Sequence, residues 1–244
     1  MEDAQKKFNE LNFPIQNLIK FEQCRKCVLD TNIVNELSKI YAYKHNLKEK
    51  LTDEKIARKL HKSISNFDDI AGVMKLYNLI ENNKVQAYIC PAVYAEIFPN
   101  DALQVCPYLD KEQVENLYVM PNDKWLGVLK LAQQRSVFLK QMNISILKLN
   151  SLQSAKVIEM HQKFMQDDTY GETVFRVKSI IDAYILAECV VLGMPLITRN
   201  TADFFCDNKI NVLQQHIDSM QSSSNIKARD YVLTPRQVEK NVVM

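Results

Sequence analysis

Short apolar runs of strand length alternate with helical periodicity along this 244-residue chain, and this alternation constrains the fold more than any other feature. The apolar runs occupy residues 26–29, 85–89, 144–149, 195–198 and 210–213. Helical patterns are predicted at 32–43, 52–61, 68–82, 91–98, 123–141, 152–166 and 179–192. Strands that are separated by helices form parallel sheets, because each helical crossover returns the chain to the same end of the sheet. The sequence therefore predicts an α/β fold with a central parallel sheet of about five strands flanked by helices.

Glycine is scarce, with four residues in the whole chain. Hairpin-rich all-β folds need positive φ angles at many turns, and glycine adopts these most readily. The composition therefore argues against such folds and favours long helices. Pro91 at a first helical turn and Gly193 just past a helix end are the expected boundary residues.

Two segments fall outside the simple alternation. Residues 38–84 carry several charged helical patterns between two predicted strands, more than one crossover requires, and are predicted to form a helical insertion beside the sheet. From residue 215 the chain becomes polar, which predicts a mobile C-terminal tail apart from the short apolar YVL at 231–233. We therefore expect a domain over residues 1–214 and a tail over 215–244.

Charge and hydropathy limit the possible environments and partners. The formal net charge is +2, from 31 Lys and Arg against 29 Asp and Glu, so nucleic-acid binding would require a local basic patch. The charged N-terminal segment does not resemble a signal peptide, and no run approaches the roughly 18 apolar residues of a membrane span. A cytoplasmic protein without membrane contact is expected. Several of the six cysteines lie inside apolar runs, which favours reduced core thiols over disulfides.

Asp30 ends the first predicted strand, in the sequence VLDTN. Ligand sites of open parallel sheets lie outside the carboxyl ends of the strands, so Asp30 is a candidate site residue. The alternative is a helix cap, in which its side chain accepts a hydrogen bond from a free amide of the following helix. Taken alone, the two interpretations are equally good.

Two further acids lie on strongly apolar helices. Glu96 is the only charged residue between Val85 and Asn100, whereas a solvated helix face would carry more charge. Asp182 is predicted in the first turn of SIIDAYILAECVVLG. Its alternative interpretation is also good, because Ser179 and Asp182 have the spacing of a capping box.

The fourth acid follows the predicted strand at 195–198. Asn200 and Asp203 lie in the polar turn RNTADF, where Asx turns would explain either residue. Together the four acids attach to the crevice side of one sheet. Two carboxylates about 4 Å apart repel by about 4 kcal/mol at an effective dielectric near 20, so such a cluster is unstable unless protons or cations neutralise it. Mg²⁺ or Mn²⁺ prefers oxygen ligands and supports phosphodiester displacement, which makes it the expected cofactor.

These stretches resemble the PIN-domain nucleases. The resemblance rests on VLDTN, on the lone glutamate in VYAEI and above all on DAYILAECVVLGMPLITRNTADF, in the order of the family's acidic motifs. It implies a Rossmann-like sheet and a Mg²⁺- or Mn²⁺-dependent endoribonuclease (a hydrolase) acting on single-stranded RNA. It also implies the metal-site residues Asp30, Glu96, Asp182 and Asp203, with Asn32, Thr198 and Asn200 as auxiliary groups. Some members of the family are toxins of toxin–antitoxin pairs, so an antitoxin, another protein partner or a homodimer is a further expectation.

Basic residues and rival functions complete the sequence-based picture. Arg176, Lys178 and Arg199 flank the third and fourth acids and are candidates for phosphate contacts, although Lys178 is also placed to pair with Asp182. A dinucleotide-binding enzyme would need a GxGxxG turn, which the chain lacks. The stronger rival is a PIN-like scaffold without catalysis that binds RNA or a protein partner. The presence of all four acids argues against it.

Overall fold

Five parallel strands form one sheet in the computed structural model, in the order β3-β2-β1-β4-β5. The strands are β1 (Lys26–Leu29), β2 (Gln86–Ile89), β3 (Ser145–Ile146), β4 (Leu196–Ile197) and β5 (Val232–Leu233). This confirms the predicted α/β fold with a parallel sheet flanked by helices. The structure describes residues 21, 25–45, 51–62, 64, 66–98, 102–109, 125–165, 173–204, 214–215, 218, 227 and 230–238.

Strand β1 is the centre of the sheet. Its Val28 pairs with Tyr88 of β2 on one side and with Leu196 of β4 on the other. Cys27, Val28 and Leu29 are completely buried. A strand covered by helices on both faces must be apolar on both sides, which is why KCVL lacks the alternation of a half-exposed strand.

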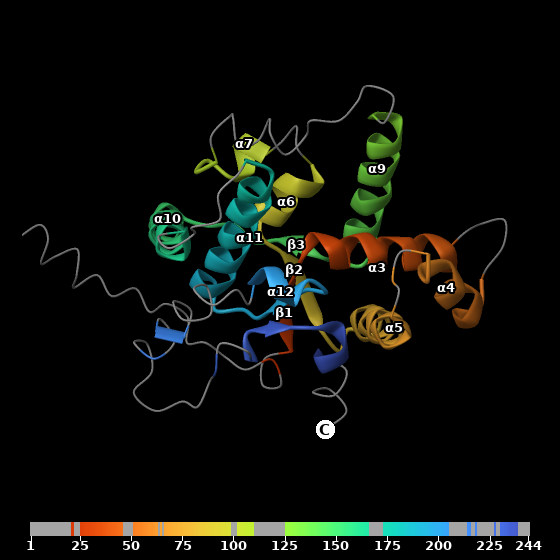
Figure 1. Ribbon diagram of the computed structural model, residues 1–244. Helices are drawn as coiled ribbons and strands as arrows, with labels where there is room; N and C mark the ends of the chain where they lie inside the picture. The colour runs from red at the N-terminus through yellow and green to blue at the C-terminus, as the bar shows by residue number, and fades with distance from the viewer. Residues whose placement is uncertain are drawn as a thin grey trace, which may run out of the picture.

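The described helices are α3 (Thr31–Lys44), α4 (Asp53–Leu60), α5 (Phe67–Glu81), α6 (Pro91–Ile97), α7 (Ala102–Val105), α9 (Trp125–Gln141), α10 (Ser151–Met165), α11 (Thr173–Val191) and α12 (Thr201–Phe204). Eight of these nine helices form two groups. One contains α3, α4, α5 and α9, with α3 packed against the other three; the other contains α6, α7, α10 and α11, with α11 packed against α6 and α10. Figure 1 shows the two groups on opposite sides of the strands. Contacts between α3 and α6 join them near the carboxyl end of β1.

The edge strand β5 corrects the predicted domain boundary. The strand predicted at 210–213 lies outside the described residues, and the fifth strand comes from YVL within the predicted tail. Tyr231 is buried, and its hydroxyl donates to the carbonyl of Cys189 at 3.1 Å. A boundary at residue 214 would therefore remove an edge strand from the sheet. The polar composition predicted a tail apart from YVL, and an apolar run of three residues was too short to be identified as a strand.

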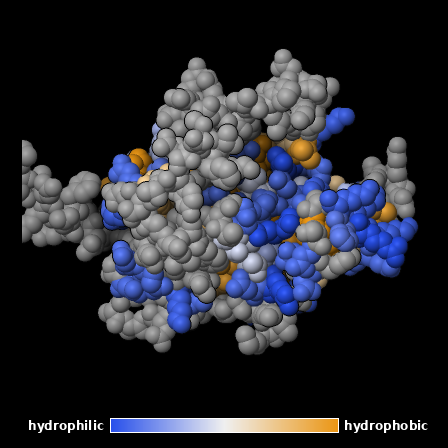
Figure 2. Space-filling model, in the orientation of Figure 1, coloured by the Kyte–Doolittle hydropathy of each residue, from blue (hydrophilic) through white to orange (hydrophobic). Residues whose placement is uncertain are grey.

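The segment predicted as a helical insertion contributes to the core. Helix α3 continues without a break to Lys44, so the additional elements are α4 and α5. Their outward-facing residues are hydrophilic in Figure 2, whereas Ile56, Val73 and Tyr77 are fully buried. A Cβ added to Gly72 of α5 would lie 2.8 Å from the backbone nitrogen of Arg236. Helix α5 therefore packs closely against the chain that follows β5.

Thiols and hydropathy agree with two expectations. Four cysteines, at positions 27, 90, 106 and 189, are free and buried, as predicted for reduced core thiols. Cys24 and Cys206 lie outside the described residues. Within the described part of the chain, no helix combines the length and apolar character that crossing a membrane requires.

Candidate functional site

Asp30 lies at the junction of β1 and α3 and is almost completely buried. Its backbone is extended, and one carboxylate oxygen accepts a hydrogen bond from the Thr31 amide at 2.7 Å, so the residue does cap α3. The other oxygen accepts from Asn32 Nδ2 at 2.5 Å and from Thr198 Oγ1 at 2.6 Å. A helix cap requires only the backbone contact. The side-chain contacts therefore give Asp30 a second structural role.

Asn32 and Thr198 extend this contact into a network between two strand ends. Thr198 follows β4 and is completely buried, and its hydroxyl accepts from Asn32 Nδ2 at 3.1 Å and from the Asn200 amide at 3.0 Å. The Arg199 amide donates to Asn32 Oδ1 at 3.1 Å. Three sequence-predicted residues thus lie together with Asp30: Asn32, Thr198 and Asn200. We call Asp30, Asn32 and Thr198 the switch-point network.

The network occupies the topological switch point of the sheet. From β1 the chain proceeds to β2 and β3 on one side, and it then returns to β4 and β5 on the other side. The carboxyl ends of β1 and β4 are therefore adjacent, while their connections diverge. Open α/β sheets bind ligands in the crevice at this position.

Glu96 is connected to the network through Thr31. It lies on α6, and its Oε2 accepts a hydrogen bond from the Thr31 hydroxyl. Thr31 directly follows Asp30, so the first two predicted acids belong to one hydrogen-bonded unit. Sequence reasoning missed Thr31, although its position between Asp30 and Asn32 was the available signal.

Asp182 is not a capping residue, and the capping-box interpretation is wrong. Helix α11 begins at Thr173, six residues before the predicted start, so Asp182 lies about two and a half turns inside it. The predicted start followed the uninterrupted apolar run after Ser179, whereas in residues 173–178 the apolar positions alternate with Arg176 and Lys178. Helix α11 packs against α6, which carries Glu96, and against α12, which carries Asp203.

Three predicted residues have no described side chain. Asp203 lies on α12, while Arg176 and Lys178 lie on the first part of α11. Of the predicted basic residues, only Arg199 is described as a side chain, and it pairs with Glu36. The proposed pair between Lys178 and Asp182 therefore stays a prediction.

The groups at the switch point are oxygen donors of the kind that hard cations prefer. They are the carboxylates of Asp30 and Glu96, two threonine hydroxyls and a carboxamide, which suit Mg²⁺ or Mn²⁺ better than softer metals. Among the described side chains, no group of three or more His, Cys, Asp or Glu residues is arranged to hold a metal ion. A complete set of metal ligands therefore requires the side chain of Asp203, or requires the described acidic side chains to move closer together.

Glu188 is a buried acid that sequence reasoning overlooked. It is completely buried on α11, and its two carboxylate oxygens lie 3.2 and 3.0 Å from the Ala92 amide at the start of α6. The N-cap residue of α6, Cys90, makes no side-chain capping bond, so Glu188 supplies that function. Burial raises the pKa of Glu188 to about 8, against the lowering effect of hydrogen bonds from Cys90 and Ala92. Glu188 is the only charged residue between Asp182 and Arg199, so the apolar surroundings that identified Glu96 also mark Glu188.

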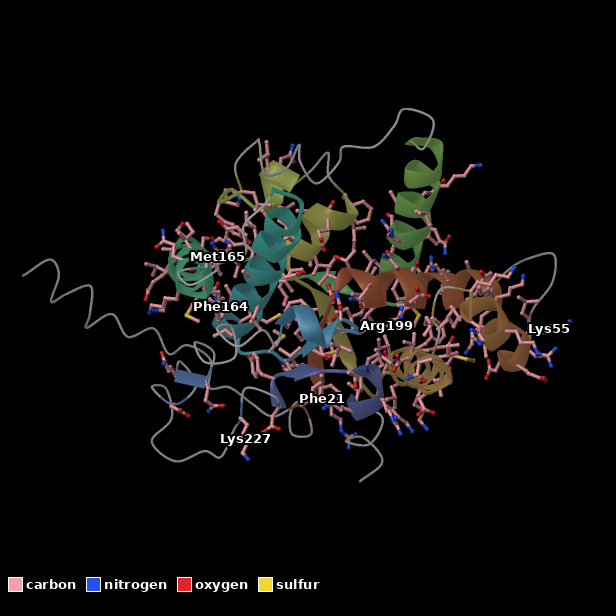
Figure 3. The ribbon with its side chains drawn as sticks, in the orientation of Figure 1. Phe21, Lys55, Phe164, Met165, Arg199 and Lys227 are labelled. Carbon is pink, nitrogen blue, oxygen red and sulfur yellow. The ribbon has the colours of Figure 1, made fainter. Side chains whose placement is uncertain are left out.

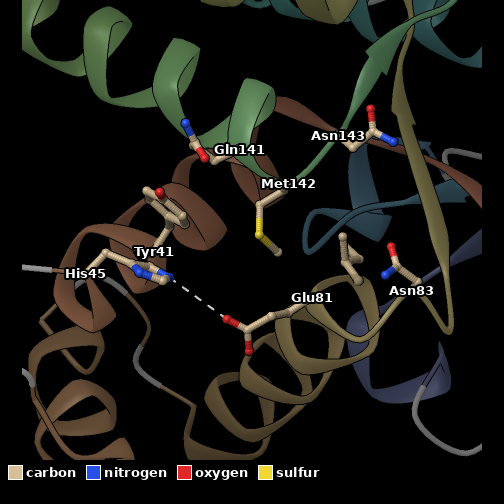
Figure 4. Close-up of a pocket in the computed structure, with 8 residues that line it drawn as sticks. Tyr41, His45, Glu81, Asn83, Gln141, Met142 and Asn143 are labelled. Carbon is tan, nitrogen blue, oxygen red and sulfur yellow. Dashed lines mark ion pairs between the residues drawn. The ribbon is translucent and has the colours of Figure 1, made fainter.

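An open pocket of about 280 Å³ lies away from the network (Figure 4). It is lined by Tyr41, His45, Ile80, Glu81, Asn83, Gln141, Met142 and Asn143. Asn83 and Asn143 precede β2 and β3, so the pocket lies near the amino ends of the strands, opposite Asp30. None of the predicted site residues lines it.

No family model, no curated protein and no solved structure matches this chain.

Proposed function

We propose that this chain is a metal-dependent endoribonuclease of the PIN type that hydrolyses phosphodiester bonds of single-stranded RNA. The observation that carries the proposal is the buried switch-point network, joined to Glu96 through Thr31. A carboxylate that only capped α3 would not require a buried hydroxyl and a carboxamide to fix its second oxygen. Functional carboxylates do require such support, because their reactivity depends on orientation.

The remaining acids are carried by elements that pack together. Helix α11 contacts both α6 and α12, so Asp182 belongs to the same group of elements as Glu96 and Asp203. In this proposal Asp30, Glu96, Asp182 and Asp203 hold one or two Mg²⁺ or Mn²⁺ ions. When bound, such ions lower the pKa of a water molecule and stabilise the leaving oxygen of the phosphodiester.

The chain's own side chains keep these acids in place. Asn32 and Thr198 orient Asp30, and Thr31 orients Glu96. Glu188 caps α6 and so sets the position of the helix that presents Glu96. Loss of a supporting group of this kind typically lowers metal affinity or activity by about 10–100-fold.

Cleavage of a fluorescein-labelled single-stranded RNA, followed on a gel with Mn²⁺ or with EDTA, tests the proposal. We expect the wild type to cleave only with the metal and Asp30→Asn to lose at least about 100-fold of the rate, since supporting groups alone contribute up to that amount. Asp53→Asn is the matched control, because Asp53 is an exposed aspartate at the start of another helix. Equal cleavage by wild type and Asp30→Asn would contradict the proposal.

A non-catalytic PIN-like scaffold is the second candidate. It is favoured by the lack of a three-residue metal set among the described side chains. This protein would bind the same RNA, or a protein partner, and leave the RNA intact with either Mg²⁺ or Mn²⁺. The cleavage assay therefore separates the two candidates directly.

A further inference from the structure

Glu36 is a buried carboxylate beside the switch-point network. It lies on α3, one turn after Asn32, and its side chain is 6% exposed. Its Oε1 accepts from Lys39 Nζ at 3.0 Å and lies 3.7 Å from Arg199 Nη1. Charged side chains are seldom buried without such pairing. Glu36 therefore holds two cations in place.

The two cations exceed the charge of the carboxylate that they share. Lys39 and Arg199 carry two positive charges, and the Glu36 carboxylate that they share carries one negative charge. Their side chains are 31% and 24% exposed, so both reach solvent while the carboxylate does not. Within the described residues, Arg199 Nε is buried and finds no acceptor. An anion arriving from solvent would meet the cations and not the carboxylate.

A similar group of one glutamate and two lysines on α10 shows why the burial of the Glu36 carboxylate matters. Glu159 lies between Lys156 and Lys163, each 2.8 Å from a carboxylate oxygen. The Glu159 side chain is 46% exposed, so it faces solvent together with its two lysines. Two cations around one carboxylate are therefore not distinctive in themselves. The group around Glu36 differs because its carboxylate is buried and because one of its cations, Arg199, donates its backbone amide to Asn32 of the switch-point network.

The backbone attaches the group around Glu36 to the candidate site. The amide of Arg199 donates to Asn32 Oδ1, and Asn32 Nδ2 donates to Asp30. Figure 3 shows Arg199 beside α12 near the centre of the molecule, whereas Lys55 lies at the far end of α4. A guanidinium presents a planar fork of N–H donors that suits phosphate oxygens.

We infer that Lys39 and Arg199, held by the buried Glu36, form a phosphate subsite that binds a phosphodiester of single-stranded RNA next to the acids. This inference rests on the proposed function, because it takes RNA as the ligand. It assigns to the site two residues, Glu36 and Lys39, that the acidic motifs do not contain. Arg199 binds phosphate through its guanidinium, while its backbone supports Asn32.

Binding of a short fluorescein-labelled single-stranded RNA, measured by fluorescence anisotropy in EDTA over a series of salt concentrations, tests the subsite. EDTA keeps the RNA intact, so binding is separated from cleavage. Each phosphate contact contributes about 0.7 to the slope of log affinity against log salt concentration on single strands. We expect Lys39→Gln and Arg199→Gln each to weaken binding and to reduce the slope by about that amount.

Lys156→Gln is the matched control, since its side chain is 34% exposed and also pairs with a glutamate three positions away. It should leave the slope unchanged. Wild-type slopes in both Lys39→Gln and Arg199→Gln would overturn the subsite. If thermal melting shows that Arg199→Gln does not fold, Lys39→Gln decides the result, because its ammonium lies on the helix surface.

The failure of the subsite and the failure of the nuclease are distinguishable with the same RNA. Cleavage in Mn²⁺ together with unchanged slopes would reject the subsite and keep the nuclease. Intact RNA in Mn²⁺ together with reduced slopes would reject the nuclease and keep the subsite.

Discussion

Glu188→Gln should remove the pH dependence of stability that the buried carboxyl imposes. Burial raises the pKa of Glu188 from 4.5 to about 8 in the folded protein. Each tenfold change in proton affinity corresponds to about 1.4 kcal/mol, so the ionised carboxylate destabilises the fold by up to about 5 kcal/mol. This value is an upper bound, because a buried charge can recruit water or shift its surroundings.

The sign follows from proton uptake. Between pH 4.5 and about 8 the folded protein binds more protons at Glu188 than the unfolded chain does. Its contribution to the free energy of unfolding is therefore complete below pH 4.5 and declines as pH rises through the folded pKa. Glutamine keeps an oxygen that accepts from the Ala92 amide and stays neutral at every pH. We expect the variant to gain on the wild type by up to about 1.4 kcal/mol per pH unit in this window.

Thermal melts of both proteins at a series of pH values measure this difference. One kcal/mol corresponds to roughly 2–4 °C of Tm in a chain of this size. Other titrating groups are common to both proteins and cancel in the comparison. Glu159→Gln is the control, because hydrogen bonds from Lys156 and Lys163 lower the pKa of that exposed acid, which stays ionised throughout. Parallel Tm curves for wild type and Glu188→Gln would refute the reasoning.

Two further substitutions test the geometry around the site. Thr198→Val removes the hydroxyl that donates to Asp30 and accepts from Asn32 and Asn200. The free energy of unfolding, measured in urea, should fall by about 1–3 kcal/mol, and RNA cleavage should slow. Thr198→Ser keeps the hydroxyl and should retain both stability and cleavage. Equal unfolding free energies for the two variants would show that the hydroxyl is dispensable. Gly72→Ala places a Cβ 2.8 Å from the backbone nitrogen of Arg236 and should lower the free energy of unfolding by about 1–3 kcal/mol. An unchanged Tm would mean that α5 and the segment after β5 move apart without cost.

Local sequence patterns were sufficient to predict the bounds of the elements that have strong local signals. The boundaries of β1 matched the apolar run at 26–29, and α6 began at Pro91 as predicted, because a proline at N1 is a local signal. Gly193 has a φ of 68° just past the end of α11, which the glycine signal indicated. Weak local signals failed. The apolar YVL was noted as an exception to the tail but was too short to be identified as strand β5, and the first turns of α11 interrupt their apolar residues with Arg176 and Lys178.

The sequence by itself determined the fold class and the identity of the candidate acids. Strand-length runs alternating with helices specify a parallel sheet, and Asp30 at the end of a buried strand must lie at its carboxyl edge. Both conclusions depend on residues that are close in the chain, where periodicity and capping preferences act.

Only the tertiary structure decided which residues meet. Asp30 contacts Thr198 across 168 positions because β1 pairs with β4, and no local pattern encodes that strand order. The same packing brings Arg199 to Glu36 and the start of α6 to Glu188. These pairs depend on how the helices cover the sheet, which is settled by burying their apolar faces together. The function of a lone acid in an apolar helix therefore depends on the partner that packing supplies, a backbone amide for Glu188 and a hydroxyl for Glu96.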